Sequence, residues 1–109
     1  MAQVNYKLTG SFNGWLHKIE EGILQGSVSA SLEAKNDSRI GDVRCSVRVF
    51  ERYSWMGNNR VSMTVVLFGK DNAMELTAVT SGGSQAMFFK MNTFGEEAFL
   101  DCLRDILNS

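Results

Sequence analysis

The chain has 109 residues, of which 44% are hydrophobic and 21% are charged, and its formal net charge at pH 7 is -1. This length and composition predict one globular domain, residues 1–109, and exclude an intrinsically disordered segment. The nearly neutral charge disfavours nucleic acid as a partner, because sequence-independent attraction to phosphates needs a basic protein.

Targeting signals and metal sites are not evident in the sequence. The opening residues lack a basic start followed by an apolar run, and no later run is long enough to span a membrane, so we expect a cytoplasmic protein without a membrane segment. Cys45 and Cys102 lie far apart, and His17 is the one histidine, so no metal site, cofactor or catalytic nucleophile is predicted. Both cysteines are interpreted as small buried apolar residues.

The first predicted elements are a short alternating segment over residues 4–8 and a helix between Ser11 and Gly26. The sequence does not say where the short strand lies in the sheet. In the predicted helix, apolar residues recur at helical spacing and form one stripe, namely Phe12, Trp15, Leu16, Ile19 and Ile23. Ser11 is suited to cap the helix, and Gly26 is suited to end it.

From residue 27 onward the apolar period changes to two, which predicts antiparallel strands over 27–34, 43–55, 61–68 and 74–78. In the strand 43–55 the odd positions, from Val43 to Trp55, are expected to face the core. The even positions are expected to face outward. In the next strand Val61, Met63, Val65 and Leu67 are expected to face inward.

The pair Gly82-Gly83 is interpreted as a tight hairpin turn rather than as a phosphate cradle, because the segment after it alternates like a strand. This hairpin sets a register that places each inward residue opposite another, pairing Ala78 with Met87, Leu76 with Phe89 and Met74 with Met91. Glu75 then lies opposite Lys90 on the outer face.

The last predicted element is a helix that begins at a capping box formed by Thr93 and Glu96 and runs to the C-terminus. The order predicts an α+β fold: a short strand, a helix, an antiparallel meander of about five strands and a C-terminal helix, with both helices on one face of the sheet. This order is similar to that of helix-grip and TATA-binding-protein-like domains.

A resemblance to a known family rests on two segments, "GDVRCSVRVFERYSWMGNNRVSMTVVLFG" (41–69) and "TSGGSQAMFFKMNTFGEEAFL" (80–100). They resemble the core segments of a family of short, uncharacterised bacterial proteins of unknown function, and the likeness covers most of the chain. The resemblance implies a bacterial, single-domain protein. It assigns no site residues, because no activity is established for that family.

Glu51 is the first candidate for a functional residue, because the predicted registers place this carboxylate on the inner, apolar face. Burying an unpaired carboxylate is costly, so Glu51 must find a partner, become protonated or lie where the sheet is open to water. The two interpretations are that it sits at an exposed end of the sheet or that it anchors a ligand. The ligand hypothesis is a cavity between sheet and helices for a small apolar molecule, lined by Glu51, Tyr53, Met63, Met74, Met87 and Met91.

The predicted outer face suggests a second function, because it combines arginines with large apolar side chains. The predicted interface consists of Arg48, Phe50, Arg52, Val66, Phe68 and Phe88, with Arg44 and Arg60 on the same face. Arginine and aromatic residues serve both single-stranded nucleic acid platforms and protein interfaces. The acidic overall charge favours a protein interface, most simply a homodimer.

Three classes of function therefore remain open. A non-catalytic interaction or self-associating protein comes first, and a small-ligand binder is the alternative. An enzyme is the weakest hypothesis, because Glu51 has neither a second carboxylate nor a well-placed histidine beside it. No residue is assigned a catalytic role.

Overall fold

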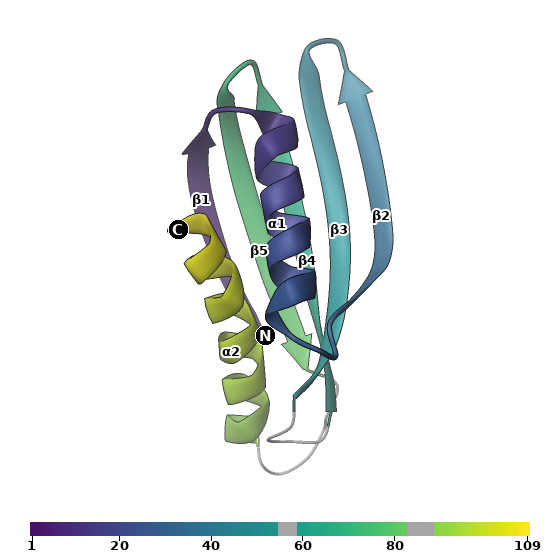
Figure 1. Ribbon diagram of the computed structural model, residues 1–109, viewed down its shortest axis with the longest axis vertical. Coiled ribbons are helices and arrows are strands. Elements are labelled where there is room, and N and C mark those ends of the chain that lie inside the picture. The colour runs from purple at the N-terminus through teal and green to yellow at the C-terminus, as the bar shows by residue number, and fades with distance from the viewer. Residues whose placement is uncertain (55–58, 83–88) are drawn as a thin grey trace.

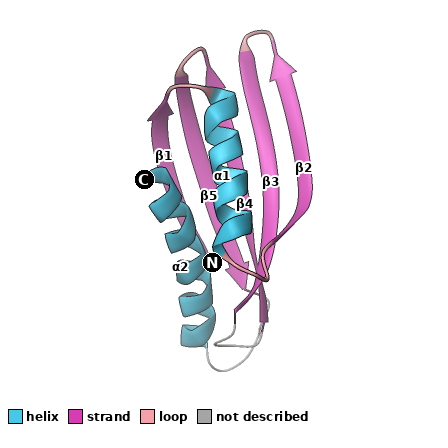
Figure 2. Cartoon of the chain, viewed as in Figure 1, coloured by secondary structure: helices cyan, strands magenta, loops and turns pink. Residues whose placement is uncertain are grey.

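The computed structural model describes the backbone of residues 1–54, 59–82 and 89–109 and the side chains of residues 1–53, 60–82 and 95–109. Its elements follow the chain in the order β1 (Ala2–Thr9), α1 (Phe12–Gly26), β2 (Ser31–Ile40), β3 (Val43–Ser54), β4 (Asn59–Lys70), β5 (Ala73–Gly82) and α2 (Phe89–Leu107). Figure 1 shows both helices packed on one face of the sheet, and Figure 2 distinguishes the helices from the strands by colour.

The strands form a five-stranded antiparallel sheet in the order β1-β5-β4-β3-β2. Strands β2 to β5 make a meander of neighbouring strands, and β1 adds to it along β5. The α+β class, the element order and the placement of both helices on one face confirm the prediction. The first strand, whose place was open, is the outer neighbour of β5.

Helix α1 forms where the helical spacing predicted it. The side chain of Ser11 accepts a hydrogen bond of 3.0 Å from the backbone N–H of Gly14, which satisfies one of the free amides at the helix start. Phe12, Ile19 and Ile23 are buried against the rest of the core. The predicted cap and stripe are confirmed.

The core lies between the sheet and the two helices. Strand β4 contributes alternate residues to it, with Val61, Met63, Val65 and Leu67 each at most 1% exposed. Helix α2 covers the same face with Phe99, Leu100, Leu103 and Leu107. The inward sides predicted for β4 and for the last helix are confirmed.

The strand predicted after the glycine pair is wrong, because Phe89, Lys90 and Met91 belong to α2, which begins at Phe89. Gly83 and Met87 lie outside the described residues. The neighbour predicted for β5 is replaced by β1, in a register that pairs Val4 with Ala78, Tyr6 with Leu76 and Leu8 with Met74. A short apolar run fits either a strand or a helix, and a strand from the other end of the chain pairs here instead.

The capping box is wrong for the same reason, since Thr93 and Glu96 lie inside α2 rather than at its start. Glu96 is 5% exposed and accepts a hydrogen bond of 2.9 Å from the backbone N–H of Gly82. Its other carboxylate oxygen lies 2.6 Å from the amino group of Met1. Glu96 therefore ties α2 to the end of β5.

The two faces of β3 are reversed relative to the prediction. The β3–β4 register places Arg48 opposite Val65 and Phe50 opposite Met63, so the even positions of β3 face the helices. Arg48 is 4% exposed and Phe50 is fully buried. A register shift of one residue exchanges all the side chains of a strand between faces, and the β3–β4 pairing sets that register.

Candidate interaction surface on the open sheet face

The sheet face turned away from the helices, called here the open face, carries an apolar centre. The apolar side chains on it are Val43, Cys45, Val47 and Val49 from β3, Val66 and Phe68 from β4, and Val79 from β5. Cross-strand pairs join them, with Cys45 opposite Phe68 and Val47 opposite Val66. Phe68 is 43% exposed and Val43 is 42% exposed, so large apolar groups meet solvent here.

Charged side chains on the open face stand at its two ends. One end carries Lys7, Lys70 and Glu75, where Lys7 on β1 is opposite Glu75 on β5. At the other end Arg60 donates a hydrogen bond of 2.7 Å from Nε to Oε1 of Glu51. That hydrogen bond raises the pKa of the Arg60 guanidinium, which also lies 5.1 Å from the centre of the Tyr53 ring.

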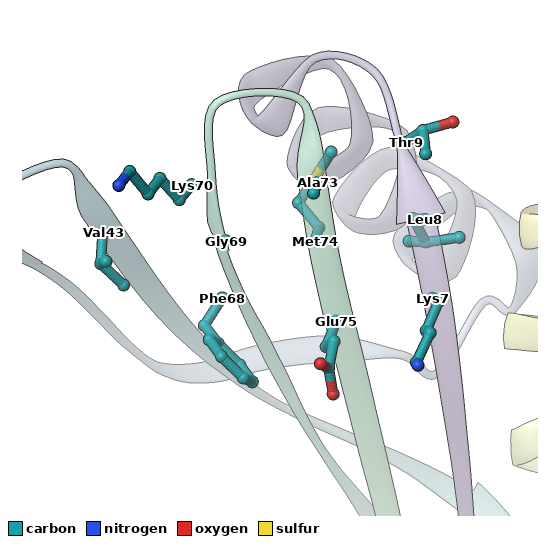
Figure 3. A pocket seen from close by; sticks show the side chains of 10 residues that line it. All are labelled: Lys7, Leu8, Thr9, Val43, Phe68, Gly69, Lys70, Ala73, Met74 and Glu75. Carbon is teal, nitrogen blue, oxygen red and sulfur yellow. The ribbon is translucent and has the colours of Figure 1, made fainter.

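A shallow hollow of about 390 Å³ lies at the lysine-bearing end of the open face. Its lining includes Lys7, Val43, Phe68, Lys70, Ala73 and Glu75. Figure 3 shows Phe68, Glu75 and Lys7 side by side across β4, β5 and β1, with Lys70 and Val43 to the left of Phe68. The hollow thus combines an apolar wall with two ammonium groups and one carboxylate.

The residues predicted to line an internal ligand cavity are not brought together. Glu51 and Tyr53 lie on the open face, whereas Met63 and Met74 are buried in the core on the other side of the sheet. Met87 lies outside the described residues, as does the side chain of Met91. The position predicted for Glu51, on the inner face, is wrong because the faces of β3 are reversed.

The residues predicted to form the interface are divided between the two faces. Val66 and Phe68 lie on the open face, as predicted. Arg48, Phe50 and Arg52 lie instead under the helices, and Phe88 is outside the described residues. The side chain of Arg52 packs over the Phe99 ring at 4.7 Å, and its Nη1 lies 3.2 Å from Sγ of Cys102.

Arg48 is buried, and oxygen atoms of α1, of β2 and of the Val47 carbonyl in β3 surround its guanidinium. It pairs with Glu20 of α1 through Nε and with Asp37 of β2, whose Oδ1 lies 3.0 Å from Nη1. Ser46 donates a hydrogen bond of 2.6 Å to Asp37. This bond and the contact with Arg48 hold the pKa of Asp37 below its usual value. The cluster attaches α1 to the β2–β3 hairpin.

The sequence signal that would have identified the open face lies in β4. Its inward residues alternate with Ser62, Thr64, Val66 and Phe68, and those outward positions grow more apolar toward its end. The neighbouring strand β3 then contributes Val43, Cys45, Val47 and Val49, which were assigned to the core. These residues were missed because the predicted faces of β3 were reversed.

The fold and the surface define an α+β protein built on one antiparallel sheet, with one face covered by two helices and the other carrying an exposed apolar patch. The chain belongs to DUF6054, a family of unknown function whose model matches residues 1–109. This result confirms the predicted membership in a family of unknown function. A search of curated proteins finds no match to the chain.

Within residues 1–54, 59–82 and 89–109, no helix is long and apolar enough to cross a membrane. Among the same described residues, no group of three or more histidine, cysteine, aspartate or glutamate side chains is arranged to hold a metal ion.

Proposed function

We propose that this protein is a non-catalytic, self-associating protein that forms a homodimer through the open face of its sheet. The observation that carries this proposal is the apolar centre of the open face, where Phe68 and Val43 are each more than two-fifths exposed while both helices cover the opposite side. Monomeric proteins seldom leave contiguous apolar patches larger than a few hundred Å² in contact with water. Burying this patch against a second copy removes it from solvent.

The arrangement of side chains on the open face supports the proposal. Protein interfaces commonly combine an apolar centre with a polar, charged rim, and here the charged groups Lys7, Lys70, Glu51 and Arg60 stand at the ends. A two-fold axis in the plane of the interface brings the same patch of both copies together. Homodimerisation therefore needs no second complementary surface.

The area of the open face is also close to what a stable dimer requires. Five strands spaced about 4.8 Å apart, each about ten residues long at about 3.3 Å per residue, give a face of roughly 24 by 33 Å, or about 800 Å². Stable complexes bury about 800 Å² on each partner. The face alone is thus large enough for a dimer of ordinary size.

The substitution Phe68→Lys tests this proposal. In the monomer, the new ammonium group is hydrated and lies opposite Glu75 on β5, so the fold is expected to be kept. In the dimer, the same charge is desolvated at the interface, which is costly. Sedimentation equilibrium at high micromolar concentration is expected to show a clearly higher average mass for the wild type than for Phe68→Lys, because only the wild type associates through the open face.

The matched control for this experiment is Val28→Lys. Val28 is a fully exposed apolar residue in the connection between α1 and β2, outside the strands that form the open face. It receives the same charge and is expected to leave the dimer unchanged. A wild type that stays monomeric at high micromolar concentration would refute the proposal. Phe68→Lys and Val28→Lys lowering the average mass equally would also refute it.

The hollow beside Phe68 favours a second candidate function, binding of a small apolar molecule that carries an anionic group. Phe68 and Val43 provide apolar contacts, and Lys7 and Lys70 supply two positive charges against the single carboxylate of Glu75. This site replaces the internal cavity predicted around Glu51. Small-molecule sites typically combine apolar walls with a few polar groups in this way.

A nuclear magnetic resonance titration distinguishes this candidate from non-specific binding. Octanoate is expected to shift the amide signals of Gly69, Ala73 and Lys7 in a saturable way. Octylammonium, which has the same alkyl chain and the opposite charge, is expected to bind more weakly because the two lysine ammonium groups repel it. Equal binding of the two compounds, or shifts spread over the whole protein, would contradict the ligand hypothesis.

We further infer a cytoplasmic location. Cys45 and Cys102 are both free thiols, which accords with a reducing compartment. The bacterial origin implied by the family resemblance and the likeness to helix-grip domains stay predictions.

A further inference from the structure

The edge strand β2 has one side without a neighbour in the sheet. Among the described residues, β2 pairs with β3 alone, and all residues from 33 to 40 are exposed. Figure 1 shows β2 at the margin of the sheet, beside the helices rather than beneath them. An edge strand presents backbone N–H and C=O groups that can pair with another strand.

The charges along β2 alternate in sign, in the order Glu33, Lys35, Asp37 and Arg39. Charged residues on an edge strand usually discourage pairing between copies, because like charges meet. An alternating pattern has the opposite effect when the strand meets itself in the antiparallel direction, since positive and negative side chains can then lie opposite each other.

We propose that β2 pairs with β2 of a second copy, antiparallel and centred on Asn36, so that the two sheets become continuous. A continuous sheet with two-fold symmetry needs an axis perpendicular to the sheet, so the residue at the axis lies opposite its own copy. With Asn36 at the axis, Lys35 of each copy lies opposite Asp37 of the other, and Ala34 lies opposite Ser38. The contact therefore contains two cross-strand ion pairs.

The charge pattern selects this register over its neighbours. An axis at Lys35, Asp37 or Arg39 would place a charged residue against its own copy, which is destabilising. An axis at Ser38 also pairs opposite charges but uses less of the strand. The register shift between Leu32 and Ala34 ends the regular part of the strand, so Glu33 is not counted among the pairs.

The side chain of Asp37 can take part while keeping its contacts with Arg48. It is 54% exposed despite the ion pair with Arg48, so part of the carboxylate is open to a lysine on the other copy. The edge contact also leaves the open face uncovered. Pairing through β2 and dimerisation through the open face therefore use different surfaces, and neither depends on the other.

Disulfide cross-linking tests the register directly. The protein would carry Cys45→Ser and Cys102→Ser to remove its own thiols, and Phe68→Lys to suppress contact through the open face. In that background Asn36→Cys places two thiols opposite each other at the axis, where the Cα–Cα separation of about 4.5–5.5 Å permits a disulfide. After mild oxidation, gel electrophoresis under non-reducing conditions is expected to show a band at twice the chain mass of 12.1 kDa.

The matched control is Lys35→Cys in the same background. In the proposed register the two copies of this position are offset by two residues along the strands, or roughly 7 Å, in addition to the spacing between strands of about 4.8 Å, so a disulfide is out of reach. Adding Lys35→Asp to the Asn36→Cys protein is expected to suppress cross-linking, because it places like charges opposite each other. Equal cross-linking of the Asn36→Cys and Lys35→Cys proteins, or none in either, would overturn the proposal whatever the outcome at the open face.

Discussion

Phe50→Ala is expected to lower the free energy of unfolding by about 3–5 kcal/mol, as truncation of a buried phenylalanine commonly does. Phe50 is fully buried on β3, opposite Met63 and under the helices. Its removal leaves a cavity that the tightly packed core can close only in part. Since domains are stable by about 5–15 kcal/mol, urea denaturation followed by circular dichroism should show a large shift of the midpoint.

The matched control is Phe68→Ala on the neighbouring strand. Phe68 is 43% exposed on the open face, so its truncation removes less buried area and creates no enclosed cavity. The measurement should be made on dilute protein, so that association through the open face does not contribute. If Phe68→Ala lowered the free energy of unfolding as much as Phe50→Ala or more, the assignment of the two faces would be contradicted.

Gly69→Ala is expected to destabilise the protein by about 1–3 kcal/mol, although it adds one methyl group. A Cβ at this position would collide with the backbone carbonyl oxygen of Ala73 and would lie 2.6 Å from Cγ of Met74. The carbonyl belongs to the neighbouring strand and cannot move without disturbing the β4–β5 hairpin. Thermal and urea denaturation should both detect the lower stability of Gly69→Ala.

Gly26→Ala provides the control for this substitution. Gly26 is the last residue of α1, and a Cβ there meets no atom within 4 Å. Alanine has the higher helix propensity by up to about 1 kcal/mol, so the variant is expected to be as stable as the wild type or slightly more stable. An unchanged stability in Gly69→Ala would show that the β4–β5 hairpin accommodates a side chain there.

Local periodicity was sufficient to predict several elements. The stripe of α1, its cap at Ser11, the alternation of β4 and the apolar face of the last helix all follow from residues close together in the sequence. These elements have one apolar and one polar side, so a single arrangement buries the apolar groups. The sequence by itself therefore determined the α+β class and the order of its elements, except in the segment 87–91.

The segment 87–91 shows where local patterns are ambiguous. Its apolar residues fit a strand, and a strand there gave a consistent hairpin with β5. In the structure Phe89 begins α2 and β1 occupies the edge of β5. The choice depended on a strand more than sixty residues away from β5, as the pairing of Leu8 with Met74 illustrates, and no local window contains that information.

The open face was predicted only in part for a related reason. Val66 and Phe68 were placed correctly from the alternation of β4, but both sides of β3 carry apolar residues, with Val47 and Val49 on one and Phe50 on the other. Only the pairing of β3 with β4 decided which side is buried. It buried Arg48, which the sequence placed at the surface, because Glu20 and Asp37 are brought to its guanidinium by α1 and β2. A charge can be buried when its partners come with it, and those partners meet only in the tertiary structure.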